Sequence, residues 1–238
     1  MKNIIVDSEF WKLFPDAQIN LLVIKNIDNS VSKGKEKYFV ELLNQGKKAG
    51  MQFLDHEIFS ENKVIREWRE AFKKFKTKKG ARSSIEALLK RVNQNRDFSP
   101  INPLVDIYNS ISMKYAVPAG GEDLDKIVGN LHLGKAEGGE SFFPLGAEKD
   151  SPALPEELIY YDEKGAICRC LNWREAQRTM LQETTQNAIL VIEAINCEQA
   201  VRAGKAILEL KEQVDDLLDT ESKNYLLNKE NPTLVNFL

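Results

Sequence analysis

Hydrophobic residues in the first half of the chain recur mainly at helical spacing. The pattern predicts a short strand, a helical turn and a second strand over 3–27, and then a series of helices in which apolar positions stand three or four residues apart. The second strand is predicted over 19–24, and the helices over about 34–45, 61–76, 83–92 and 103–115. The last helix has two start signals, because Asn102 is a good N-cap and Pro103 suits the first helical position.

The predicted helix over 61–76 has two different faces. Its apolar face is formed by Val64, Trp68, Phe72 and Phe75. A neighbouring stripe is formed by Arg66, Arg69, Lys73 and Lys76. This helix can therefore pack against a core and still present a basic surface to solvent.

The periodicity changes from helical to extended after Pro118, which cannot extend the helix before it. Three later segments are predicted to contain strands: 127–136, 158–171 and 187–195. The middle segment is expected to form a hairpin through Asp162 to Gly165. Because strands and helices do not alternate regularly, the pattern favours an α+β fold over a doubly wound sheet.

The C-terminal part is expected to contain one more helix, over about 197–219, and then a tail over 220–238. We see no repeat, low-complexity tract or clean linker, so we expect a single domain over 1–238.

The stretch "AGGED" follows Pro118 directly. We expect Gly120 and Gly121 to let the chain turn into the next strand. We interpret Asp123 and Asp125 as turn and register residues that accept backbone N–H groups, rather than as metal ligands.

Charge is distributed unevenly, although the net charge is only −3. Between residues 62 and 96, twelve Lys and Arg residues stand against three Glu residues. Such a surface can neutralise the phosphates of a polynucleotide, although a solvated helix face is an equally good interpretation. The candidate RNA-binding residues, called the basic ridge below, are Arg66, Arg69, Lys73, Lys74, Lys76, Lys78, Lys79 and Arg82.

Several classes of protein are disfavoured by the sequence. No apolar run approaches the roughly 20 residues that span a bilayer, and the first residues lack the pattern of a signal peptide, so we expect a cytoplasmic protein. Three cysteines and two histidines at unsuitable spacings disfavour a metal site and Ser-His-Asp chemistry. The glycine-rich segments match no nucleotide-binding loop, and we expect no cofactor.

Glu193 interrupts a strand that otherwise reads as buried. Alternation places it on the same face as Ile189 and Val191. A carboxylate there either borders a pocket or marks a strand end that emerges into water. The segment Asn172–Arg174 follows a predicted strand, and its polar and planar side chains suit either the rim of a ligand site or an ordinary turn.

The segment over 101–127 resembles the B3/B4 domain in the beta chain of phenylalanyl-tRNA synthetase. The residues that carry the resemblance are Asn102, Val105, Asp106, Asn109, Pro118, Asp123, Leu124, Asp125, Lys126 and Ile127. The resemblance extends over about 18–196. It implies a single B3/B4-type domain with a β-sandwich-like core flanked by helices, without the catalytic partner of the synthetase.

That domain removes wrongly attached tyrosine, so the resemblance implies a free-standing editing hydrolase that acts on misacylated tRNA. It also places Glu193 at the position of the family's editing-pocket glutamate, as the catalytic residue. The expected pocket residues are Gly120, Gly121, Asn172, Trp173 and Arg174.

Two other functions remain open. Gly120 stands where the family has a histidine, which is compatible with a non-catalytic RNA-binding or interaction module. A small-molecule amidase or esterase could use the same pocket. The expected partner is tRNA or another RNA, with no DNA specificity and no membrane, and the sequence predicts no oligomeric state.

Overall fold

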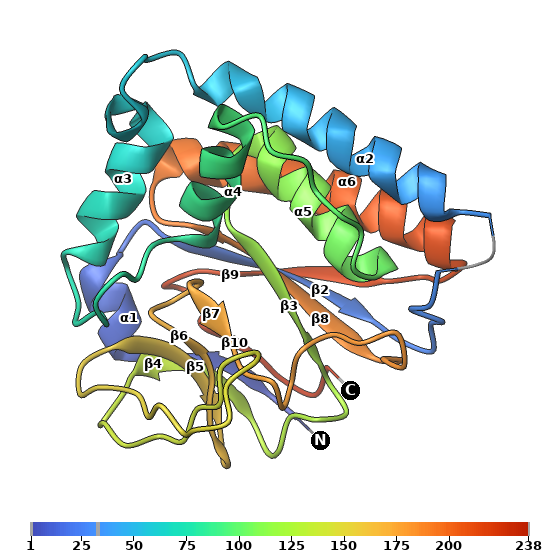
Figure 1. Ribbon diagram of the computed structural model, residues 1–238. Coiled ribbons are helices and arrows are strands. Elements are labelled where there is room, and N and C mark those ends of the chain that lie inside the picture. The colour runs from blue at the N-terminus through green and yellow to red at the C-terminus, as the bar shows by residue number, and fades with distance from the viewer. Residues whose placement is uncertain (1, 32–33, 238) are drawn as a thin grey trace.

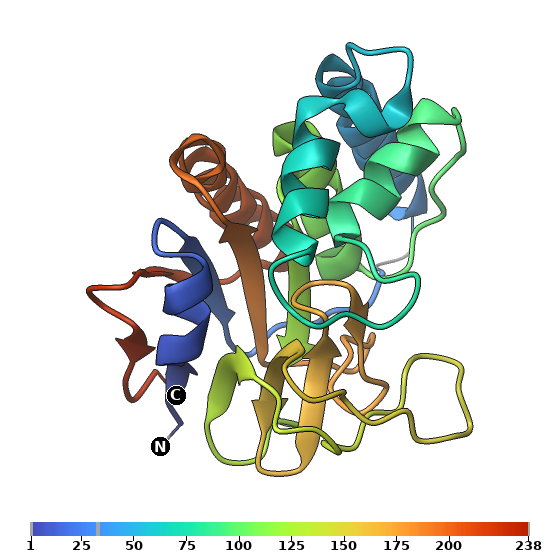
Figure 2. The same ribbon diagram turned by 90° about the vertical axis from the view of Figure 1, so that its left-hand side faces the viewer.

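Two β-sheets face each other across a shared core, and helices cover the outer face of the smaller sheet (Figures 1 and 2). The computed structural model describes residues 2–31 and 34–237. The larger sheet has the strand order β10 (Thr233–Leu234), β1 (Ile4–Val6), β4 (Leu131–Lys135), β5 (Leu158–Asp162), β6 (Gly165–Arg169), β7 (Arg174–Glu175). The smaller sheet has the order β3 (Ala119–Asp123), β8 (Ala188–Ala194), β2 (Gln18–Ile24), β9 (Lys223–Leu227). The pairing of β1 with β4 is parallel, and the other pairings of named strands are antiparallel.

The helices fall into two groups. Two long helices, α5 (Pro103–Tyr115) and α6 (Cys197–Leu218), pack on the outer face of the smaller sheet, and a third, α2 (Glu36–Gly50), packs against α5. The others are α1 (Ser8–Leu13), α3 (Lys63–Phe72) and α4 (Ser84–Asn93), with short 3-10 turns at Met51–Phe53 and Phe59–Glu61. In the described part of the chain, no helix is long and apolar enough to cross a membrane.

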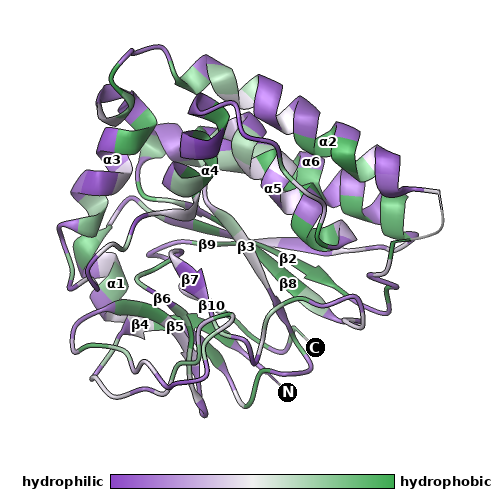
Figure 3. Ribbon diagram, viewed as in Figure 1, coloured by the Kyte–Doolittle hydropathy of each residue, from purple (hydrophilic) through white to green (hydrophobic). Residues whose placement is uncertain are grey.

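Strand β8 separates two hydrophobic cores because its side chains alternate in direction. Ile189 and Val191 point into the core between the two sheets. Leu190 and Ile192 point into the core beneath α2, α5 and α6. Figure 3 shows β2 and β8 as strongly hydrophobic, whereas the covering helices also carry hydrophilic residues. The predicted α+β class with a sandwich-like core flanked by helices is confirmed.

Most predicted elements are present, with shifted ends. Helix α5 starts as expected, because the Asn102 side chain accepts the backbone N–H of Val105 and Pro103 is the first helical residue. That helix ends at Tyr115, where Ala116 adopts a left-handed conformation (φ 49°), so Pro118 is not the residue that stops it. The helix expected over 61–76 covers only Lys63–Phe72, although Phe75 is still buried beyond its end.

The prediction that Gly120 and Gly121 form a turn is wrong, because both residues lie within strand β3. Each pairs in register with a residue of β8, Gly120 with Val191 and Gly121 with Leu190. The chain turns after β3, at residues 124–126. Asp123 accepts the backbone N–H of Asp125 at 3.0 Å, as expected of a turn residue.

The segment expected to be a tail completes both sheets. Strand β9 pairs along β2, and β10 pairs with β1. The described ends of the chain therefore lie side by side at one edge of the molecule, as both ribbon views show (Figures 1 and 2).

Candidate functional site

A pocket of about 440 Å³ is lined by residues from both sheets and from α4 and α5. This volume is within the range of sites that hold small molecules. Its lining includes all six residues expected at the site: Gly120, Gly121, Asn172, Trp173, Arg174 and Glu193. The structure thus brings them together from strands β3, β7 and β8 and from the turn after β6, while their functions stay predictions.

Glu193 does not emerge into water at the end of its strand, because only 3% of it is exposed. Its Oε1 accepts the hydroxyl of Tyr160 at 2.7 Å, and its Oε2 accepts the side-chain amide of Asn172. Burial raises the pKa of Glu193 to about 7, and these two hydrogen bonds offset part of that rise. The Tyr160 bond also joins the two sheets across the core.

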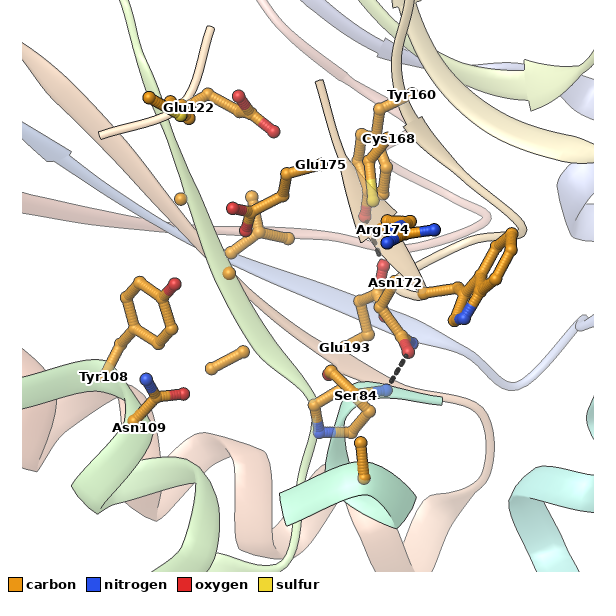
Figure 4. A pocket seen from close by; sticks show the side chains of 18 of the residues that line it. Ser84, Tyr108, Asn109, Glu122, Tyr160, Cys168, Asn172, Arg174, Glu175 and Glu193 are labelled. Atoms are coloured by element: carbon orange, nitrogen blue, oxygen red, sulfur yellow. Dashed lines mark hydrogen bonds between the residues drawn. The ribbon is translucent and has the colours of Figure 1, made fainter. Parts of the chain in front are cut away.

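Asn172 is presented by a tight turn between β6 and β7. Two consecutive residues of this turn have left-handed backbone conformations, Cys170 (φ 51°) and Leu171 (φ 63°), which is costly for residues other than glycine. The turn places the Asn172 side chain between two elements. Its oxygen accepts the backbone N–H of Ser84 at 2.9 Å, and its nitrogen donates to Glu193 (Figure 4).

Two further carboxylates line the same pocket and were missed by the sequence analysis. Glu122 comes from β3 and Glu175 from β7, and Figure 4 shows both beside the pocket with Glu193. Burial, together with the charge of Glu175, raises the pKa of Glu122 well above its ordinary value. Burial also raises the pKa of Glu175 to about 7. In the sequence, both look like ordinary surface residues, because "GGED" and "WRE" carry no burial signal.

The two glycines of β3 leave room for different neighbouring groups. A Cβ atom at Gly120 would lie 3.2 Å from Oε1 of Glu175, so the absent side chain leaves room for that carboxylate. A Cβ atom at Gly121 would meet the Leu190 side chain, and would lie 2.9 Å from Cδ1 of Leu181 and 3.2 Å from the Ile189 carbonyl oxygen. The glycine pair is therefore explained by the close approach of side chains and backbone from neighbouring strands and loops, and not by turn geometry.

Two side chains on α5 also line the pocket, Tyr108 and Asn109 (Figure 4). Burial, followed by the charges of Glu175 and Glu122, raises the pKa of the Tyr108 phenol. Asn109 belongs to the motif that carried the resemblance, so that motif contained a signal for the pocket that residue-by-residue reasoning did not use.

All eight residues of the basic ridge are exposed along α3 and the segment that follows it. Two of them are engaged by carboxylates. Arg69 donates to Oε1 of Glu86 from both Nε (3.1 Å) and Nη2 (2.7 Å), and Lys73 pairs with Glu70 at 2.5 Å. The ridge ends close to the pocket, because Arg82 stands two residues before Ser84, which contacts Asn172.

The described residues include no group of three His, Cys, Asp or Glu side chains arranged to hold a metal ion. Cys168 and Cys170 are buried and unbridged.

Part of the chain is similar to known proteins. A family model described as the B3/4 domain matches residues 67–216. The phenylalanine–tRNA ligase beta subunit of Mycoplasma genitalium is 35% identical over 103 residues, which is 43% of this chain and 12% of that protein. The same subunit from Bartonella henselae is 30% identical over 108 residues, or 45% of this chain and 13% of that protein. The matches thus cover about an eighth of these relatives.

Among solved structures, an N-terminal fragment of the phenylalanyl-tRNA synthetase beta-subunit from Pyrococcus horikoshii aligns with a TM-score of 0.48. The sequence identity is 10%, and the alignment covers 92% of this chain and 49% of that chain.

Proposed function

The chain belongs to the B3/4 domain family, and from that premise we propose that it hydrolyses the ester bond of a misacylated tRNA. The family relatives are beta subunits of a tRNA ligase, which supports a tRNA substrate. Such a substrate also favours a cytoplasmic place of action. The observation that carries the proposal is a buried carboxylate, Glu193, fixed by two hydrogen bonds in a pocket large enough for an aminoacyl group.

Ester hydrolysis needs no strong nucleophile in this pocket, because an aminoacyl ester is already activated. Positioning a water molecule and holding the amino acid supply much of the rate. Each oxygen of Glu193 accepts one hydrogen bond from the protein and keeps acceptor capacity for a water. A carboxylate whose pKa lies near neutrality is also well matched to remove a proton from that water.

The proposed hydrolysis has two stages. The water oxygen bonds to the ester carbonyl carbon while Glu193 accepts the water proton. The bond between that carbon and the ribose oxygen then breaks, and the proton passes to the ribose oxygen. The products are the free amino acid and the uncharged tRNA.

The basic ridge supplies the complementary surface for the tRNA backbone. Its residues approach the pocket along the chain, and the contact between Ser84 and Asn172 connects that segment to the pocket wall. Phosphates bound along the ridge would therefore lead toward the pocket.

The test measures release of the amino acid from a panel of misacylated tRNAs. We expect Glu193→Gln to slow hydrolysis by about 100-fold or more, since loss of a general base commonly has an effect of that size. Affinity for uncharged tRNA should stay unchanged. The matched control is Glu212→Gln, an exposed carboxylate on α6. Equal rates for Glu193→Gln and the unaltered protein would refute the assignment of Glu193.

A non-catalytic RNA-binding module is the second candidate, because the basic ridge is a surface separate from the pocket residues. It predicts salt-sensitive RNA binding with no ester cleavage on any tRNA of the panel. Free aminoacyl esters in the same panel distinguish a third function: a small-molecule esterase would cleave them as efficiently as the tRNA-linked substrates.

A further inference from the structure

Glu122 and Glu175, called the carboxylate pair below, line the pocket from two different strands. Glu122 is only 7% exposed, and its Oε2 is a buried atom without a hydrogen-bond partner. The carboxylate of Glu175 lies against the backbone of β3 at Gly120. Two acidic groups from different strands thus border one cavity, in a place where burial of an unpaired charge is costly.

Two of the nearby cations are engaged by other groups, and a third, Arg174 on the pocket lining, lies 5.8 Å from the centre of the Trp173 ring. Arg178, which affects the pKa of Glu122, donates to Asp162 from Nη1 (2.9 Å) and Nη2 (2.7 Å), and to the Lys126 carbonyl. Arg91 on the pocket lining donates to the Asp97 carbonyl at 2.5 Å. Within residues 2–31 and 34–237, no lysine or arginine forms an ion pair with either member of the carboxylate pair.

Glu193 differs from the carboxylate pair in this respect. Both of its oxygens accept hydrogen bonds from the protein, from Tyr160 and from Asn172. The pocket therefore has one carboxylate that the protein holds in place and two that lack a partner of opposite charge. A ligand can supply the positive charge that the carboxylate pair lacks.

We propose that the carboxylate pair binds a positively charged group on the side chain of the substrate's amino acid, an amine or a guanidine. This inference rests on the proposed function, because it names the substrate class of the same pocket. The selected amino acid is then basic rather than aromatic or aliphatic.

The chemistry of the donors favours a cation over a hydroxyl. A hydroxyl group has a single hydrogen to donate, whereas an ammonium group has three and a guanidinium five. A cation also stabilises the ionised form of both carboxyl groups, which burial and their proximity disfavour in the free protein, and a neutral group cannot do this. The raised pKa values of Glu122 and Glu175 agree with a pair that forms no ion pair in the described part of the free protein.

The experiment compares lysinamide with norleucinamide, measured by calorimetry on the unaltered protein. Both ligands carry the α-amino group, and their side chains have similar length, so the pair isolates the terminal charge. We expect lysinamide to bind about tenfold more tightly or better, as one charge-assisted hydrogen bond would give. Tyrosinamide serves as the aromatic competitor. Binding of norleucinamide or tyrosinamide as tight as that of lysinamide would overturn the proposal.

A double substitution tests whether the carboxylate pair causes the preference for lysinamide over norleucinamide. In Glu122→Gln combined with Glu175→Gln, the ratio between lysinamide and norleucinamide should fall to about one, because the pair can no longer attract a charge. Glu212→Gln, measured beside it, should keep the preference. A ratio that survives the double substitution in folded protein would also overturn the proposal. The first comparison needs no variant, so it holds even if the double variant does not fold.

These measurements separate the two proposals. Preference for lysinamide without hydrolysis of any aminoacyl-tRNA supports the cation site and refutes the hydrolase. Hydrolysis of tyrosyl-tRNA or norleucyl-tRNA faster than lysyl-tRNA, with no preference for lysinamide, supports the hydrolase and refutes the cation site.

Discussion

The side-chain oxygen of Asn172 accepts the backbone N–H of Ser84 at 2.9 Å, which ties the turn after β6 to the first residue of α4. The nitrogen of the same amide donates to Glu193. One side chain therefore couples the helix that follows the basic ridge to the carboxylate in the pocket. Because an amide supplies both a donor and an acceptor, no charged or apolar residue can keep both contacts.

We expect Asn172→Ala to lower both stability and hydrolysis. The substitution leaves the Ser84 N–H and one oxygen of Glu193 without their partners, which costs about 1–3 kcal/mol of the free energy of unfolding. The measurements are urea unfolding and the release of amino acid from tRNA. Asn187→Ala is a matched control. That amide also makes two contacts, with Asn26 N–H and Asp125, but it lies outside the pocket lining. Equal losses of hydrolysis in the two variants would contradict the specific function of Asn172.

Stability and hydrolysis should change in opposite directions with pH. Burial raises the pKa of Glu193 from 4.5 in the unfolded chain to about 7. Between these values the folded protein keeps a proton that the unfolded chain has released. The contribution of Glu193 to stability is therefore fully present below pH 4.5 and is lost as the pH rises through 7, by about 1.4 kcal/mol per pH unit within the interval.

Hydrolysis should rise over the same interval, because Glu193 accepts a proton from water only when it is ionised. Unfolding and hydrolysis are measured from pH 5 to pH 8. Glu193→Gln should remove the contribution of Glu193 to the slope of stability against pH, while the pKa of Glu175, also raised to about 7 by burial, keeps part of the slope. An unchanged slope in the variant would show that Glu193 ionises normally in the folded protein.

Charge reversal on the basic ridge should weaken RNA binding, provided that the substituted residues have no acidic partner. Arg66, Lys76 and Arg82 form no ion pair with any residue that the structure describes. Changing all three to Glu should reduce affinity for tRNA and flatten its dependence on salt concentration, because fewer counterions are released on binding. The control changes Lys37, Lys48 and Lys205 to Glu on the exposed surfaces of α2 and α6. A greater loss of tRNA affinity in the ridge variant than in the control variant supports binding at the ridge. Equal losses in the two variants would mean that only net charge matters.

The two glycines of β3 predict different consequences for the same substitution. Gly121→Ala should destabilise the protein by about 1–3 kcal/mol, because the new methyl group meets Leu190, Leu181 and the backbone of Ile189. Gly120→Ala meets only the end of the Glu175 side chain, so stability should change little while affinity for pocket ligands changes. Thermal unfolding and calorimetry check the two effects. A larger loss of stability for Gly120→Ala than for Gly121→Ala would contradict these contacts.

The sequence predicted elements well where a periodic pattern decides the structure. Strand β8 shows this: the alternation along the strand placed Glu193 on the inner face with Ile189 and Val191, and the structure agrees. Helix α5 was predicted with its cap, because Asn102 and Pro103 are local signals.

The missed features depend on neighbours that are distant in sequence. Gly120 and Gly121 resemble a turn locally, and only their pairing with β8 reveals a strand. Glu175 is separated from Glu122 by 53 residues, so their presence in one pocket follows from the arrangement of the two sheets, which no local pattern encodes. The expected tail failed as a prediction for the same reason, since β9 and β10 are stabilised by pairing with strands near the other end of the chain.

The pairing of β9 with β2 and of β10 with β1 has a consequence for biosynthesis. Residues 223–234 leave the ribosome after all the other strands of both sheets, and until then β2 and β1 each present an open edge. The centre of the smaller sheet and its covering helices can assemble earlier, but these two edges close only after residues 223–234 have been synthesised. The nascent chain is therefore most exposed to wrong strand pairing in this interval, when a chaperone would protect it best.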